Sequence, residues 1–148
     1  MTDLRSDRAF FEILCKSHAR FVGRRLAPEG GDAAWLYEDA PFAVLAHDAS
    51  ADPRFIYANK TAQRCFGYSW EEFVGLPSRL SAEAPERAAR QALLDAVAQN
   101  GFAEGYRGVR ITKSGRRFWI EDGVVWRLVA PDGSPAGQAA TFSTWRDA

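Results

Sequence analysis

The chain has 148 residues, of which 47% are hydrophobic and 26% charged, values typical of one folded domain with its own core. Basic residues and acidic residues both number 19, so the net charge of zero gives no reason to expect nucleic-acid binding. No apolar run is long enough to cross a bilayer, and the first residues lack the apolar core of a signal peptide. The sequence therefore predicts a cytoplasmic protein with no membrane association.

The N-terminal segment predicts an amphipathic helix over residues 7–26, because apolar residues recur there at helical spacing. A proline and two glycines within residues 28–31 end this helix and form a linker. The chain thus divides into a helix and linker, residues 1–32, and a main domain, residues 33–148. A helix with so broad an apolar face must bury it. We therefore expect a homodimer formed through Phe10, Phe11, Leu14 and Phe21.

The main domain alternates short strands and helices. A short helical turn at 35–37 precedes two strands at 42–47 and 54–58, two short helices, a longer helix at 83–100, and strands at 104–113, 116–129 and 136–146. Ser114-Gly115 and Asp132-Gly133 supply the turns between the last three strands. This order predicts an α+β fold, a five-stranded antiparallel sheet with short helices on one face and an extra N-terminal helix.

Two motifs resemble a known sensory fold. Residues 57–75 contain Tyr57, Asn59 and Ala62, then F-G-Y-S-W-E-E-F-V-G, in which Ser69 and Glu72 form a capping box. This pattern resembles the first half of a PAS domain. Residues 112–119, T-K-S-G-R-R-F-W, resemble a hairpin of the LOV branch of PAS domains, which are flavin-binding blue-light sensors.

A more specific resemblance is to the MEKHLA domain, a PAS-related family that includes small free-standing bacterial proteins. It is carried by Trp35, Tyr37, Phe42, Asn59, Ala62 and the Phe66-Gly67-Tyr68 run. The resemblance implies a non-enzymatic sensory or ligand-binding module that signals through dimerisation or a partner protein. Two alternatives stay open: a protein–protein interaction domain with a filled core, and a divergent flavin-binding photosensor or redox sensor.

The residues at the flavin-reading positions of a LOV domain disfavour flavin. Ser78 stands where the photoreactive cysteine would be, and a hydroxyl is a far poorer nucleophile than a thiolate. The polar groups that would bind the ring edge are replaced at Pro77, Ala82, Arg110, Ile120 and Trp145. Each flavin group left unpaired would cost about 1–3 kcal/mol. Haem is disfavoured as well, because residues 83–100 contain no histidine to act as an axial ligand.

The strand at 116–129 is expected to form one wall of a ligand pocket. Alternate residues of this strand are apolar from Phe118 to Leu128, and Asp122 interrupts them. Asp122 is either a polar anchor for a ligand or part of a bulge with Gly123 that turns its carboxylate to solvent. Trp126 and Trp145 either fill the core or leave a slot for a flat apolar ligand.

The pocket is expected to be lined by Tyr57, Asn59, Cys65, Ser78, Arg110, Ile120, Asp122, Trp126 and Trp145. Cys65 is either a redox centre or an inert buried thiol. Two histidines and two cysteines at unrelated spacings do not form a metal site. No acid–base or nucleophile constellation is present in the sequence, so we expect no enzymatic activity. A small apolar molecule is the expected ligand.

Overall fold

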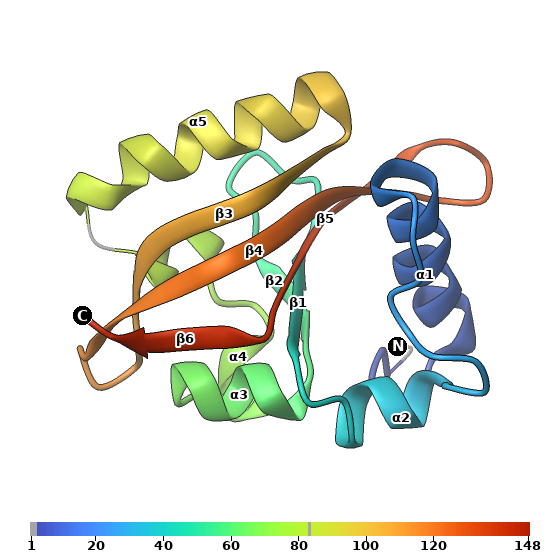
Figure 1. Ribbon diagram of the computed structural model, residues 1–148, viewed down its shortest axis with the longest axis horizontal. Helices are drawn as coiled ribbons and strands as arrows, with labels where there is room; N and C mark the ends of the chain where they lie inside the picture. The colour runs from blue at the N-terminus through green and yellow to red at the C-terminus, as the bar shows by residue number, and fades with distance from the viewer. Residues whose placement is uncertain (1–2, 83) are drawn as a thin grey trace.

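The computed structural model describes residues 3–82 and 84–148, without the side chains of residues 84–87 and 90. Its centre is an antiparallel sheet in the order β2-β1-β5-β4-β3 (Figure 1). The strands are β1 (Ala43–His47), β2 (Phe55–Ala58), β3 (Phe102–Ile111), β4 (Arg117–Val129) and β5 (Pro135–Phe142). After a break at Ser143, β6 (Thr144–Asp147) pairs with the first half of β4. The predicted α+β fold with an antiparallel sheet is confirmed, and its last strand is divided in two.

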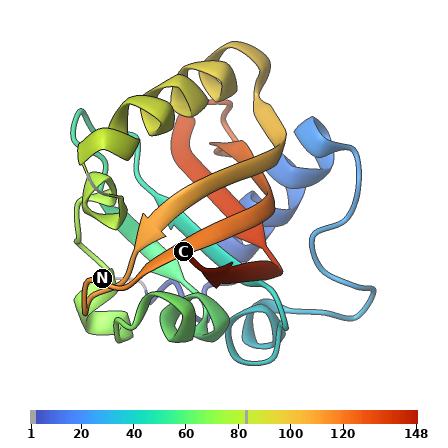
Figure 2. The same cartoon turned by 60° about the vertical axis from the view of Figure 1, so that its left-hand side comes forward.

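Helices cover both faces of this sheet. One face carries α1 (Arg8–Val22), which packs on β4, and α2 (Ala33–Glu38) lies beside it. The other, concave face carries α3 (Lys60–Phe66), α4 (Trp70–Phe73), the short 3-10 helix η1 (Ser78–Ser81) and α5 (Ala84–Asn100). In Figure 2, α1 and α5 lie on opposite sides of the strands. Among the described residues, no helix has both the length and the apolar character needed to cross a bilayer.

Side-chain caps determine where the short helices begin. The Asn59 side chain accepts a hydrogen bond from the backbone of Ala62 at the start of α3. Ser69 and Glu72 form the predicted capping box at the start of α4. The N-terminal helix is shorter than expected, because Gly23 adopts a left-handed conformation (φ 85°) and ends α1 after Val22.

The apolar face of α1 is buried within its own chain. Phe10 and Leu14 belong to the core beneath the sheet, and the hydroxyl of Ser17 accepts a 3.0 Å hydrogen bond from the backbone N–H of Val129. Phe11 packs against the same core. The ring of Phe21 lies so close to Gly101 that a β-carbon there would be 2.3 Å from it. The four residues expected to form a dimer interface thus make contacts inside one protomer.

A β-bulge divides β4 into two halves that face opposite ways. Asp122 has a φ of 51°, and the register with β3 shifts between the pairs Tyr106–Gly123 and Gly108–Ile120. Before the bulge, Ile120 points into the concave core; after it, Trp126 points into the core under α1. The strict alternation expected for residues 118–128 is therefore wrong, because the extra residue reverses the side-chain parity.

Candidate ligand cavity

The concave face of the sheet encloses a cavity of about 60 Å³. Its walls are mostly apolar and come from five strands, α3, η1 and α5; they include Leu45, Phe66, Leu93, Leu94, Ile120 and Phe142. The polar lining residues include Ser78 of η1 with Tyr106 and Arg110 of β3, which form one polar corner, and His47, Gln138 and Thr141 on β1 and β5. An apolar cavity with a few convergent polar groups is the usual form of a small-molecule site.

A chain of hydrogen bonds organises this polar corner. Nη1 of Arg110 donates to the hydroxyl of Ser81 at 2.7 Å, and that hydroxyl donates to the backbone carbonyl of Ser78 at 2.7 Å. Nε of Arg110 donates to the hydroxyl of Tyr106 at 3.2 Å. Tyr106 reaches Arg110 across Gly108, where a β-carbon would lie 2.7 Å from Cζ of the phenol ring. Tyr106, Gly108 and Arg110 alternate along β3 and therefore lie on one face of it, since side chains alternate along a strand.

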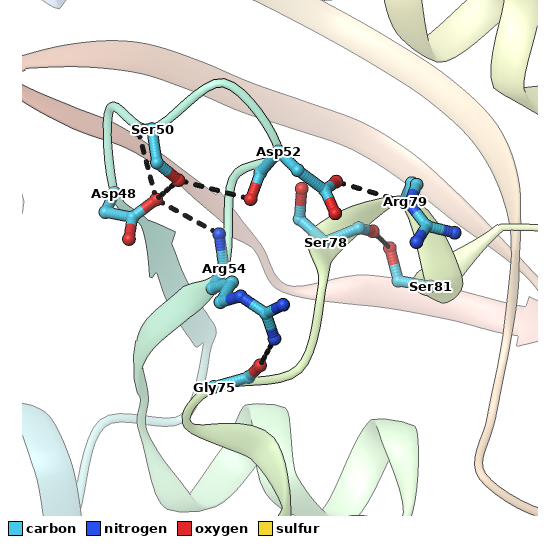
Figure 3. A network of polar contacts seen from close by, with 8 residues as sticks. All are labelled: Asp48, Ser50, Asp52, Arg54, Gly75, Ser78, Arg79 and Ser81. Carbon is cyan, nitrogen blue, oxygen red and sulfur yellow. Dashed lines mark hydrogen bonds and ion pairs between the residues drawn. The ribbon is translucent and has the colours of Figure 1, made fainter.

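The loop between β1 and β2 holds η1 in place (Figure 3). Asp48 folds the loop by accepting hydrogen bonds from Ser50 and from the backbone of Arg54 at 3.1 Å. The guanidinium of Arg54 donates to the carbonyl of Gly75 at 2.7 Å, and Arg79 of η1 pairs with Asp52 at 3.2 Å.

The backbone adds a further connection between this loop and the cavity. The N–H of Ser78 donates to the carbonyl of Pro53 at 2.8 Å, and Ser78 and Ser81 are both buried. The loop network therefore fixes the position of the helix that supplies the acceptor for Arg110.

The structure brings three of the expected pocket residues together: Ser78, Arg110 and Ile120 line the cavity. Two more lie in the adjoining core. Trp145 is half-buried opposite Ile120 and packs edge-to-face on Phe142 at 5.6 Å between ring centroids, and Cys65 is buried in the same cluster. Neither reaches the cavity surface.

Trp126 and Asp122 lie elsewhere, which corrects the expectation that they line the pocket. Trp126 is fully buried under α1, with its ring edge-on to His18 at 4.8 Å between centroids, and its indole N–H has no hydrogen-bond partner among the residues that the structure describes. Asp122 is exposed at the bulge, so its carboxylate faces solvent as in the second of the two interpretations above. His18 is itself buried and bonded through Nδ1 to the carbonyl of Arg24 at 2.9 Å.

Tyr57 and Asn59 are structural residues that also lie outside the cavity. Tyr57 packs against Phe10 and Tyr37 in the core on the α1 side. Asn59 is fully buried and bonds four backbone groups: its carbonyl oxygen accepts from Val44 and Ala62, and its amide nitrogen donates to Leu36 and Phe42. Asn59 thereby connects α2, β1 and α3.

The two thiols are poorly suited to redox chemistry. Burial raises the pKa of Cys65 to about 12 and that of Cys15 to about 11, so both remain protonated at neutral pH. Both cysteines are free. Within residues 3–82 and 84–148, no group of histidine, cysteine or carboxylate side chains has the arrangement of a metal site.

The residues around the cavity do not fit a flavin. A volume of about 60 Å³ is far below the roughly 300 Å³ at which sites for drug-sized ligands begin. Ile120, where a hydrogen-bonding residue would be needed, is 5% exposed in the apolar wall, and Ser78 offers no thiol. The polar corner instead presents a cation, Arg110, held by neutral oxygen atoms.

The fold defined by this sheet, its helices and its concave cavity is that of a PAS domain, as comparison with solved structures shows. The PAS domain of a protein from Colwellia psychrerythraea is 21% identical and superposes with a TM-score of 0.65, covering 78% of this chain and 92% of that one. The Rhodobacter sphaeroides LOV protein is 15% identical with a TM-score of 0.60, and the match covers 72% of this chain and 61% of the LOV protein. An RNA-binding light-oxygen-voltage receptor is 21% identical with a TM-score of 0.56. That match covers 75% of this chain but only 31% of the receptor.

A family model that matches nearly the whole chain identifies the family. Residues 8–147 match the model of the MEKHLA domain, so the chain belongs to the MEKHLA domain family. The match includes α1 as well as the sheet. A comparison with curated proteins found no match.

Several cavity residues were missed from the sequence, among them Tyr106, Leu93, Leu94 and Phe142, and so was Ser81, which bonds to Arg110. One signal was available in β3, where Tyr106, Gly108 and Arg110 alternate and a glycine between two long polar side chains indicates close packing across it. Ser81 carried no such signal, because its contact with Arg110 spans 29 residues and depends on the fold.

Proposed function

We propose that this protein is a non-enzymatic sensory module of the PAS type, in which a small molecule bound in the concave cavity alters association with a partner protein or a second copy of the chain. The cavity beside Ser78, Arg110 and Ile120 is the observation that carries this proposal. The MEKHLA match and the PAS fold support it by analogy of architecture. The proposed setting is the cytoplasm, where Cys15 and Cys65 would stay reduced.

The proposal is tested by amide NMR on the full chain with three small probes: butanol, butyramide and butyrate. We expect at least one of them to shift the amide signals of Ile120 and its cavity neighbours. Ala140 faces the cavity, so Ala140→Leu should fill the space and remove the shifts. The matched control is Ala19→Leu, on the exposed face of α1, which should leave them unchanged.

A protein–protein interaction domain without a ligand is the second candidate, and the small volume of the cavity favours it. If none of the three probes shifts the cavity signals at millimolar concentration, the sensory proposal fails and this candidate replaces it. If a probe does bind, light scattering with and without it reports whether self-association responds to the ligand.

We propose a homodimer as well, although the apolar side of α1 is occupied. Because Phe10 and Leu14 are in the core, α1 can contribute to a dimer only through its outer face, which carries Ala9, Lys16 and Ala19. Light scattering of the full chain and of Ala9→Asp and Ala19→Asp variants tests this. A dimer that persists unchanged in both variants excludes the outer face of α1 as the interface.

A further inference from the structure

Arg110 presents a positive charge to the cavity that no carboxylate of the described residues balances. Its two assigned hydrogen bonds go to neutral hydroxyls, those of Ser81 and Tyr106. Arginines such as Arg79 and Arg107, by contrast, form ion pairs with aspartate or glutamate. A guanidinium has five N–H donors in a planar fork, so about three donors of Arg110 remain for another acceptor.

The surroundings make this cation a strong anchor for an anion. Arg110 is half-buried, and most of the wall beyond it is apolar, formed by side chains such as Phe66, Ile120 and Phe142; the other polar lining residues are His47, Gln138 and Thr141. A charge removed from water is costly unless it is paired, and an ion pair is stronger where the local dielectric constant is low. Arginine binds carboxylates well because its fork matches two oxygen atoms at once.

The volume of the cavity limits the size of the anion. One water needs roughly 10–15 Å³ of such space, so about 60 Å³ holds about four to six waters. A ligand of similar bulk has about four to six non-hydrogen atoms. Phosphate has the right bulk, but those of its oxygen atoms that face Ile120 and Phe142 would have no hydrogen-bond partner there. A carboxylate with a short alkyl chain matches both the charged corner and the apolar wall.

We propose that the cavity binds a short-chain monocarboxylate of about three or four carbons, with its carboxylate on Arg110 and its alkyl chain against Ile120. This inference rests on the proposed sensory function and names the chemical class of its ligand. The corner is built in advance: Ser81 and Tyr106 hold the guanidinium, and the loop network around Asp48 and Asp52 holds the helix that carries Ser81. Preorganisation of this kind lowers the entropic cost of binding.

Butyrate and butyramide separate the two proposals, because they have the same number of non-hydrogen atoms and differ in charge. Calorimetry and amide NMR on the full chain should show butyrate binding at least tenfold more tightly than butyramide, and inorganic phosphate binding more weakly than butyrate. Equal affinity for butyrate and butyramide overturns the anion anchor but leaves the sensory proposal intact. Phosphate binding as tightly as butyrate also overturns the monocarboxylate, and no binding by any probe overturns both proposals.

Variants at Arg110 provide the second measurement. Arg110→Gln should abolish the preference for butyrate, and Arg110→Lys should keep part of it because the charge remains. The matched control is Arg107→Gln on the same strand, since Arg107 stacks on Trp119 at 3.9 Å and pairs with Glu121 on the other face of the sheet. If Arg110→Gln does not fold, the butyrate-to-butyramide ratio of the Arg110→Lys variant decides. An unchanged preference in Arg110→Lys and Arg110→Gln alike refutes the role of Arg110.

Discussion

Replacing Asn59 by alanine should be among the most destabilising single changes in this protein. The side chain is fully buried and makes four hydrogen bonds of 3.0–3.1 Å, to Val44, Ala62, Leu36 and Phe42. Asn59→Ala leaves two N–H groups and two carbonyl groups without these partners. At about 1 kcal/mol for each lost bond, the free energy of unfolding should fall by about 4 kcal/mol. That is a large share of the roughly 5–15 kcal/mol that stabilises a typical domain.

Equilibrium unfolding in urea measures this loss. With a slope of about 2 kcal/mol per molar urea, the midpoint should fall by about 2 M. The control is Asn100→Ala at the exposed end of α5, which should change stability by less than about 0.5 kcal/mol. Asn59→Asp keeps the acceptor but loses both donors and buries a charge, so it should be at least as harmful as alanine. A loss below about 1 kcal/mol for Asn59→Ala would show that water or local rearrangement replaces these hydrogen bonds.

Three further results are expected. Ser17→Ala should lower the free energy of unfolding by about 1 kcal/mol in urea titrations, because the partly buried N–H of Val129 loses its acceptor; no change would mean that α1 is held by apolar contacts alone. Burial lowers the pKa of His18 below its ordinary value of 6.5, so the unfolded chain binds the proton first. Stability should therefore decline as pH falls below about 6.5, and the urea midpoint of a His18→Phe variant should lack this component. Burial raises the pKa values of Cys15 and Cys65, so both thiols should react slowly with a thiol-specific disulfide reagent at pH 8 in the native protein and rapidly in urea. Equal reaction rates in the two states would contradict their burial.

Local signals in the sequence were sufficient for the fold. The capping box of Ser69 and Glu72, the cap at Asn59 and the stop at Gly101 each act within a few residues, so spacing alone located the helices they delimit. The turns predicted antiparallel hairpins, whereas the order of the strands in the sheet depends on pairing between distant segments, such as β1 with β5, and was not predicted. Some helix ends differed from those predicted, because the backbone conformation of a single residue determined them. Gly23, which ends α1 after Val22, is the example.

The site was predicted only in part, because one residue reversed the geometry of β4. Asp122 and Gly123 indicated a bulge, yet the alternation of side chains was carried through it, which placed Trp126 beside Ile120 when they face opposite cores. Arg110 and Ser78 were predicted because the resemblance to LOV domains places them at flavin-reading positions, and both line the cavity. Their actual partners, Ser81 and Tyr106, depend on tertiary contacts that spacing does not encode.

The bulge at Asp122 has a mechanical consequence. β4 is one continuous strand, yet its first half contributes Ile120 to the layer around the cavity and its second half contributes Trp126 to the layer beneath α1. A ligand that rotates or shifts the first half of β4 therefore acts on the same strand against which α1 packs. The two layers of this small protein therefore share the backbone of β4, and that strand changes face at the one non-glycine residue of the described chain with a positive φ.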